Sequence, residues 1–113
     1  ERCKQISKLL DKWCKEQGYK DSAANMLSLS YTLHVSKNEL TRYFDQCLGS
    51  TFRVWLSDIR FNAAKEMMKN FPDYSNDVIS AECGFSARTQ LYRIFKTKLG
   101  CTPTAWREGL KKV

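Results

Sequence analysis

One stretch of the sequence occurs twice and decides the fold. Residues 40–55 read LTRYFDQCLGSTFRVW, and residues 91–106, which lie 51 positions further along the chain, read LYRIFKTKLGCTPTAW. Seven of the 16 aligned positions are identical: Leu, Arg, Phe, Leu, Gly, Thr and Trp. About one identity is expected by chance, because ordinary residue types each make up roughly 5–10% of a chain. Two copies are too few for a solenoid, so the repeat predicts two similar helical units.

Each copy has the pattern of an amphipathic helix that ends at a glycine and is followed by a second helix. Gly49 and Gly100 predict the two helix ends, and Thr51 and Thr102 predict the caps of the helices that follow. The apolar side chains recur at intervals of three and four residues, as one buried helix face requires. They are Leu40, Tyr43, Phe44, Cys47 and Leu48 in the first copy, and Leu91, Ile94, Phe95 and Leu99 in the second.

The opposite faces of these two helices are polar. Most polar helix faces are simply solvated, but these two are richer in Arg, Asn, Thr and Gln than in Glu and Lys, which favours a binding surface. Arg42 and Arg93 occupy equivalent positions of the repeat. The candidate binding residues are Lys37, Asn38, Thr41 and Arg42 in the first helix, and Arg88, Thr89, Tyr92, Arg93 and Lys96 in the second.

Capping residues and helix breakers place the remaining helices. Pro is tolerated at the first helical position, and Ser, Thr and Asn are favoured as N-caps. We therefore expect an all-α chain of about seven helices. Besides the two polar helices, these are a helix over 2–17 that stops at Gly18, one over 26–33 capped by Asn25, a long linker over 52–69, one over 76–83 capped by Ser75, and a last one that starts at Thr102 and Pro103.

A three-residue corner precedes each polar helix, at 34–36 and again at 84–86. We expect His34 to accept an unusual turn backbone rather than to act in catalysis. Ser36 followed by Glu39 predicts a capping box, whereas either Ser86 or Ala87 could cap the second polar helix. A short helix, a corner and a capped amphipathic helix are the parts of a helix-turn-helix. The free N–H groups of helix starts at Ser36 and Ser86 are candidate phosphate ligands.

The charge of the chain favours an anionic partner. The 113 residues carry a formal net charge of +7, and residues 86–113 contain seven Lys and Arg against the single acid Glu108. Nucleic acid is the first candidate partner and a membrane surface the second. Because no apolar run could span a membrane and no signal peptide is present, we expect a cytoplasmic location and no membrane contact. The first residue is Glu rather than Met, so we interpret the sequence as a piece of a longer protein.

The cysteines and the single histidine do not predict a metal or catalytic site. The five cysteines form no CxxC pair, and we expect all of them to be reduced. Cys3 and Cys14 share a helix face but lie about 16 Å apart, too far for a disulfide. His34 is the only histidine, so neither zinc nor another cofactor is expected. The sequence contains no Gly-rich phosphate loop and no paired nucleophile and base, so an enzyme is not expected.

Residues 84–108, which read GFSARTQLYRIFKTKLGCTPTAWRE, resemble the DNA-binding domain of the AraC/XylS family of bacterial transcription regulators. The shared signature is Gly-Phe, Phe-Lys, Gly-x-Thr-Pro and aromatic-Arg, and RFNAAKEMM at 60–68 is similar to the linker helix of the family. The resemblance covers 26–108. Ser30 and Ser80 stand where the family usually has Ala, and such a serine can bond back to its own helix.

The resemblance implies a single domain of seven helices, with helix-turn-helix units at about 1–50 and 75–110 joined by the linker helix. Each unit would present one recognition helix to the major groove, on one side of the duplex. The base- and backbone-contacting positions of the family fall on Asn38, Thr41 and Arg42 in the first unit, and on Arg88, Thr89, Gln90 and Arg93 in the second.

The partner expected from this resemblance is double-stranded DNA, and the function is transcription regulation. RNA polymerase and a sensor or dimerisation domain in the rest of the parent chain are further expected partners. A helical interaction module whose basic faces bind RNA or an acidic protein is the alternative from a different class. That alternative does not require Arg42 and Arg93 at matching positions of the repeat.

Overall fold

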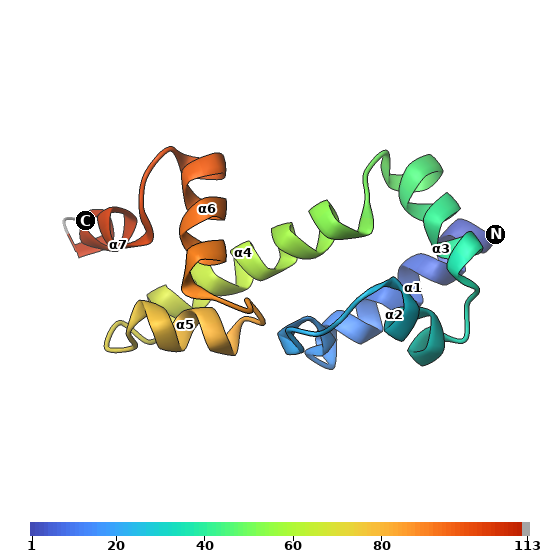
Figure 1. Cartoon of the computed structure of the whole chain (residues 1–113), viewed down its shortest axis with the longest axis horizontal. Coiled ribbons are helices and arrows are strands. Elements are labelled where there is room, and N and C mark those ends of the chain that lie inside the picture. Colours follow the sequence, from blue (N-terminus) through green and yellow to red (C-terminus); the bar gives the residue numbers. More distant parts are fainter. Residues whose placement is uncertain (112–113) are drawn as a thin grey trace. The chain divides into compact units, whose positions relative to one another are not determined.

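The helices follow one another in the order that the repeat predicts (Figure 1). The computed structural model describes residues 1–111, and within that range the chain forms seven α-helices and no strand. It divides into two compact units, Glu1–Leu56 and Ser57–Val113. The boundary falls inside α4, the expected linker helix. The all-α prediction is confirmed, and the expectation of a single domain stays a prediction.

The bounds of the elements agree with the expected helices to within a few residues, except in the first polar helix. There a short α-helix continues as a π-helical turn, η2, and a 3₁₀ turn, η1, follows the first helix. In chain order the elements are α1 (Arg2–Lys15), η1 (Gly18–Lys20), α2 (Met26–Leu33), α3 (Lys37–Arg42), η2 (Tyr43–Cys47), α4 (Phe52–Asn70), α5 (Asn76–Glu82), α6 (Arg88–Leu99) and α7 (Pro103–Lys111).

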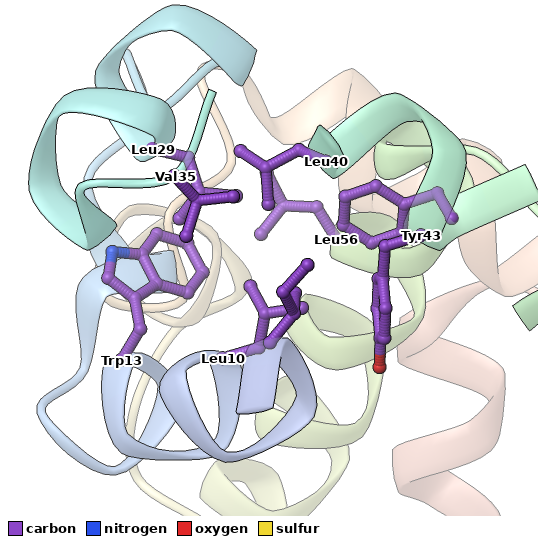
Figure 2. Packing of buried hydrophobic residues seen from close by; sticks show 9 residues of the cluster. Leu10, Trp13, Leu29, Val35, Leu40, Tyr43 and Leu56 are labelled. Atoms are coloured by element: carbon purple, nitrogen blue, oxygen red, sulfur yellow. The ribbon is translucent and has the colours of Figure 1, made fainter. Parts of the chain in front are cut away.

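Each unit has its own apolar core. In the first unit, side chains from α1, α2, the corner, α3, η2 and the start of α4 meet, as Figure 2 shows. In the second unit, α4, α5 and α6 contribute the core together with Phe85 of the corner. The buried residues are Ile6, Leu10, Trp13, Leu29, Val35, Leu40, Tyr43, Phe44 and Leu56 in the first core, and Phe61, Ala64, Met68, Ile79, Cys83, Phe85, Leu91 and Phe95 in the second.

The two copies of the repeat pack their aromatic residues alike. The ring centroids of Phe44 and Trp55 lie 5.4 Å apart, and those of the equivalent pair Phe95 and Trp106 lie 5.7 Å apart. Edge-on and tilted contacts of this kind are favourable between aromatic rings. In each copy, the phenylalanine of the polar helix thus packs against the tryptophan of the helix that follows. This contact explains why Phe and Trp recur at equivalent positions.

The backbone geometry of the repeat also matches. Gly49 and Gly100 both have left-handed backbones, with φ of 58° and 70°, a conformation that glycine adopts without a steric penalty. Thr51 Oγ1 accepts a hydrogen bond from the N–H of Val54 (3.2 Å), and Thr102 Oγ1 accepts one from the N–H of Ala105 (3.1 Å). The predicted helix ends and caps are therefore confirmed.

The two corners share one backbone arrangement. The N–H of Val35 donates to the carbonyl of Ser30 (3.2 Å), and the N–H of Phe85 donates to the carbonyl of Ser80 (3.0 Å). His34, with φ of 55°, takes the left-handed conformation expected of it. Ser30 does not bond back to its own helix as expected, because its hydroxyl donates to the carbonyl of Val35 (2.6 Å) across the corner.

The expectation that all five cysteines are reduced is wrong. Cys3 of α1 and Cys47 of η2 form a disulfide, with their Cα atoms 6.5 Å apart, and Cys14, Cys83 and Cys101 are in no disulfide. The sequence separation of 44 residues hides this pairing, because only the packing of α1 against η2 brings the two sulfur atoms together. The conclusion that Cys3 and Cys14 do not pair is confirmed.

Three further expectations need correction. Gly18 does not end α1 through a left-handed backbone; Gln17 has that conformation, and a Cβ at Gly18 would clash with the indole of Trp13. The capping box at Ser36 is only half formed, as described below. Leu48 and Leu99 lie at the ends of their helices, beyond the edge of each core, and are 43% and 42% exposed rather than buried.

Candidate nucleic-acid interface

The start of α3 is fixed by a cap and an ion pair. Ser36 Oγ accepts a hydrogen bond from the N–H of Glu39 (3.1 Å), which is the first half of a capping box. The carboxylate of Glu39 does not return to Ser36, because Arg2 of α1 donates to it through Nε at 2.7 Å. This exposed pair contributes little energy, but together with the disulfide it ties α1 to both ends of the α3–η2 segment.

The outward face of α3 is the one that the sequence predicts. Leu40, Tyr43 and Phe44 are buried in the core of the first unit. Because these residues anchor one side of the helix, the opposite side faces solvent. The side-chain hydroxyl of Thr41 donates to the carbonyl of Lys37 (2.9 Å), so its proton is already used within the helix. The exposed candidate residues are Lys37, Asn38, Thr41 and Arg42.

The start of α6 differs from that of α3. Ala87 is the N-cap residue and provides no side-chain hydrogen bond, which settles the question that the sequence left open. Ser86 lies one residue earlier, and its N–H donates to Gln90 Oε1 (3.1 Å). Gln90, an expected DNA contact, therefore has its side chain bonded to the corner in the free protein.

The outward face of α6 carries three cations. Arg88, Thr89, Tyr92, Arg93 and Lys96 line one shallow surface groove. Arg88 forms an ion pair with Asp77 of α5 (3.4 Å), and its guanidinium lies 5.8 Å from the centre of the Tyr92 ring. Among the residues that the structure describes, neither Arg93 nor Lys96 makes an ion pair. These two cations are thus available to an anionic partner without breaking an existing pair.

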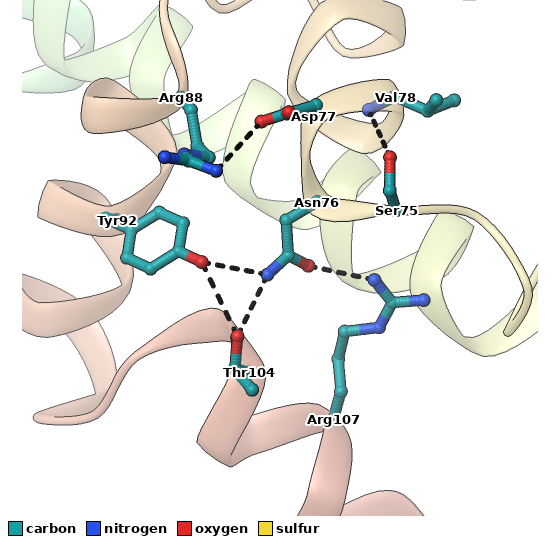
Figure 3. A network of polar contacts seen from close by, with 8 residues as sticks. All are labelled: Ser75, Asn76, Asp77, Val78, Arg88, Tyr92, Thr104 and Arg107. Carbon is teal, nitrogen blue, oxygen red and sulfur yellow. Dashed lines mark hydrogen bonds and ion pairs between the residues drawn. The ribbon is translucent and has the colours of Figure 1, made fainter.

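Tyr92 is less exposed than the other residues of this groove, and its hydroxyl joins a polar network (Figure 3). Its Oη accepts a hydrogen bond from Asn76 Nδ2 (3.0 Å) and lies 3.5 Å from Thr104 Oγ1. The hydrogen bonds with Thr104 and Asn76 lower the pKa of Tyr92 because they stabilise the phenolate. The tyrosine expected to contact DNA thus also connects α6 to α5 and α7.

Sequence reasoning missed Asn76, Thr104 and Arg107 as parts of this surface. Arg107 belongs to the aromatic-Arg signature, so the resemblance marked its position but not its role. Asn76 and Thr104 are ordinary first-turn helix residues, and no local pattern distinguishes them. Only the packing of α5, α6 and α7 brings them together with Tyr92.

Neither a metal site nor a membrane-spanning helix is found in the part of the chain that the structure describes. No three His, Cys, Asp or Glu side chains within residues 1–111 gather so as to hold a metal ion. No helix in the same range is both long and apolar enough to cross a bilayer. Two helix–corner–helix units, each with an outward polar face on its second helix, define a tandem helix-turn-helix chain.

Comparison with known proteins identifies the family. A family model described as a helix-turn-helix domain matches residues 29–109. The chain belongs to this family, the AraC-type helix-turn-helix domains. The resemblance found in the sequence is thus confirmed.

Two curated relatives are transcription regulators by name. The chain is 30% identical over 81 residues to the HTH-type transcriptional regulator RipA of Corynebacterium diphtheriae, a match that covers 72% of this chain and 24% of RipA. It is 31% identical over 70 residues to the HTH-type transcriptional regulator ExsA of Pseudomonas aeruginosa. That match covers 58% of this chain and 25% of ExsA. The matched part thus spans about a quarter of the length of these relatives.

Two solved structures have the same fold. The DNA-binding domain of AdpA, crystallised with a target DNA, superposes with a TM-score of 0.82 at 22% identity, over 95% of this chain and 93% of that one. The C-terminal domain of the response regulator yesN from Fusobacterium nucleatum superposes with a TM-score of 0.76 at 26% identity. This superposition covers 90% of this chain and 98% of that one.

Proposed function

We propose that the chain binds double-stranded DNA in a sequence-specific manner, with α3 and α6 as the two recognition helices, and that its parent protein regulates transcription. The observation that carries the proposal is the pair Arg42 and Arg93. Both arginines are exposed, and each lies on a helix whose inner side is anchored by buried Leu and Phe at equivalent positions. Two similar recognition helices would each need an outward arginine at the same position. Solvation of a helix surface does not require arginine at matching positions of the two copies.

The chemistry of the exposed residues suits the major groove. Arginine can donate two hydrogen bonds to guanine O6 and N7, and asparagine can pair with adenine N6 and N7. We therefore assign base reading to Arg42, Arg93 and Asn38. The remaining candidates are assigned to phosphates or to the edges of neighbouring bases. The N–H of Ser86 is already bonded to Gln90, so Ser86 would contact a phosphate through its hydroxyl. These candidates are Ser36, Lys37, Thr41, Ser86, Arg88, Thr89, Gln90, Tyr92 and Lys96.

Two recognition helices in one chain would read adjacent segments of the major groove. Such segments recur on one side of B-DNA about every 34 Å. The chain would then cover about two turns of the duplex without forming a dimer. The net charge of +7 supplies the sequence-independent attraction to phosphates that precedes reading.

Competition binding tests this proposal. A labelled duplex selected from a random pool is bound, and unlabelled competitors are titrated: the same duplex, a random duplex, duplex RNA and an acidic peptide. We expect the selected duplex to compete at least about a thousandfold better than the random duplex, as specific DNA-binding proteins do. Equal competition by random duplex, RNA and the acidic peptide would instead favour the interaction-module alternative.

Further partners follow from the same proposal. We propose that the rest of the parent protein carries a sensor or dimerisation domain and that the bound protein contacts RNA polymerase in the cytoplasm. Support comes from the names of RipA and ExsA, which are transcription regulators about four times as long as the matched segment. A pull-down tests the proposed contact with RNA polymerase. The full-length protein should capture the polymerase when promoter DNA is present and should not capture it when the DNA is absent.

A further inference from the structure

The side chain of Asn76, the first residue of α5, lies at the centre of the polar network in Figure 3. Its Nδ2 donates to Tyr92 Oη of α6 (3.0 Å) and to Thr104 Oγ1 of α7 (3.0 Å). Its Oδ1 accepts from Arg107 Nη1 (2.8 Å). One amide therefore bonds to both helices that follow it in the second unit, and every one of its polar atoms has a partner.

Arg107 determines which way this amide faces. A guanidinium only donates hydrogen bonds, so the oxygen of Asn76 must point toward it. The second nitrogen of Arg107, Nη2, donates to the carbonyl of Pro72 (3.0 Å). This contact holds the guanidinium against the loop before α5. With the oxygen fixed, both N–H groups of the amide must face Tyr92 and Thr104, and a flipped amide would place donor against donor.

The apolar core alone does not fix α6 in this way. Leu91 and Phe95 are fully buried, but hydrophobic contacts are non-directional and tolerate a small rotation of a helix about its axis. A hydrogen bond is directional, and Tyr92 lies on the rim between the buried and the exposed side of α6. A bond to its hydroxyl therefore restrains rotation of α6 about its axis.

We propose that Asn76 is a positioning residue, which Arg107 orients and which holds Tyr92 so that α6 presents Arg93 and Lys96 to DNA at a fixed angle. This inference rests on the proposed function. In this role the hydroxyl of Tyr92 bonds to Asn76 and fixes the orientation of α6, whereas the sequence pattern predicted that Tyr92 contacts DNA. Asn76 itself touches no base, so its substitution should affect the reading of sequence more than the attraction to phosphates.

The first test uses the free protein and needs no DNA. The pKa of Tyr92 is measured by NMR with the Cζ of tyrosine labelled. Asn76→Ala should raise this pKa toward the ordinary value of tyrosine, because a donor to the phenolate is lost. Asn76→Asp should raise it further, because a carboxylate can only accept from the phenol and repels the phenolate. Arg88 and Asp77, the charged groups beside Tyr92, are unchanged in all variants. An unchanged pKa in both variants would overturn the proposal.

The second test compares Asn76→Ala, Tyr92→Phe and the double variant for binding to the selected duplex. We expect each single variant to lose affinity about tenfold, and the double variant to lose no more than either one. For Asn76→Ala, which removes no proposed DNA contact, the affinity for random duplex and the salt dependence should be unchanged. Asn62→Ala, on the exposed side of α4, is the matched control, and thermal unfolding checks that every variant folds.

The outcomes separate the two proposals. If the double variant loses the product of the single effects, Tyr92 and Asn76 act independently, which would overturn the positioning role alone. If the wild-type protein shows no preference for any duplex, the proposed function and the positioning role both fail. Equal, non-additive losses together with the expected order of pKa values support the positioning role.

Discussion

Arg42 and Arg93 differ in their charged surroundings although they occupy equivalent positions of the repeat. Arg93 lies near Arg88 and Lys96 in one surface groove, and residues 86–113 carry seven Lys and Arg against the single acid Glu108. Arg42 follows Glu39 and precedes Asp45 on the same segment. Arg93→Ala should therefore lower the slope of log affinity against log salt more than Arg42→Ala does. Fluorescence titrations of the selected duplex at several salt concentrations measure both slopes, and equal slopes would contradict this asymmetry.

Arg42 should contribute mainly to specificity. If its guanidinium reads one guanine, Arg42→Ala should weaken binding by about 1–3 kcal/mol and relax the preference at that single base pair. Binding to a set of duplexes that each carry one substituted base pair measures this. A uniform loss across all of the duplexes would show that Arg42 contacts a phosphate instead.

Cys14 predicts a pH dependence of stability. Burial, and then the nearby charge of Asp11, raise the pKa of its thiol from 9.0 to about 11 in the folded chain. Between pH 9 and 11 the unfolded chain loses this proton while the folded chain keeps it, so stability falls as the pH rises. Because the thiol is half-buried and partly screened, we expect a loss of about 1–2 kcal/mol. Denaturant unfolding of the wild type against Cys14→Ser checks this, and identical pH profiles would contradict it.

At the scale of helices, the disulfide between Cys3 and Cys47 has the largest expected effect on stability. It closes a loop of 44 residues that contains α2 and α3. Restricting the unfolded chain in this way contributes about 2–4 kcal/mol. Reduction, or Cys3→Ser with Cys47→Ser, should therefore lower the free energy of unfolding of the first unit by that amount.

The control for the effect of reduction is the Cys3→Ser, Cys47→Ser variant. The reductant should not lower the free energy of unfolding of this variant any further. Thiol titration of the unfolded but unreduced protein should find three thiols, those of Cys14, Cys83 and Cys101, which are in no disulfide. Five thiols in the purified protein, with no effect of reductant, would contradict the disulfide.

What the sequence could predict among these elements depends on the range of the interaction. The caps at Asn25, Ser75 and Thr51 were predictable because each involves neighbours three residues apart. The partner of Glu39 was not, because Arg2 competes from 37 positions away. In the same way, a residue's position in the repeat predicted that α6 has an outward face, but only tertiary packing shows that Tyr92 turns toward Asn76.

For the whole chain, the repeat was the most informative signal. Equal spacing of Leu, Phe, Gly, Thr and Trp predicted two helical units with equivalent cores, and the aromatic pairs at Trp55 and Trp106 bear this out. The boundary between the two units falls inside α4. Apolar residues of α4 before this boundary belong to the first core, and those after it belong to the second core. The candidate binding faces were predictable for the same reason. Leu40 and Leu91 are buried at equivalent positions of the repeat, and Arg42 and Arg93 are exposed at equivalent positions.

Selection of bound duplexes from a random library, with the spacing of selected positions recorded, tests the central claim most directly. Two recognition helices in adjacent major-groove segments predict two blocks of selected base pairs whose centres lie about 10–10.5 bp apart. Arg42→Ala should erase information in one block and Arg93→Ala in the other. A single block, or no enrichment over the starting pool, would contradict the account of α3 and α6 as paired readers of DNA.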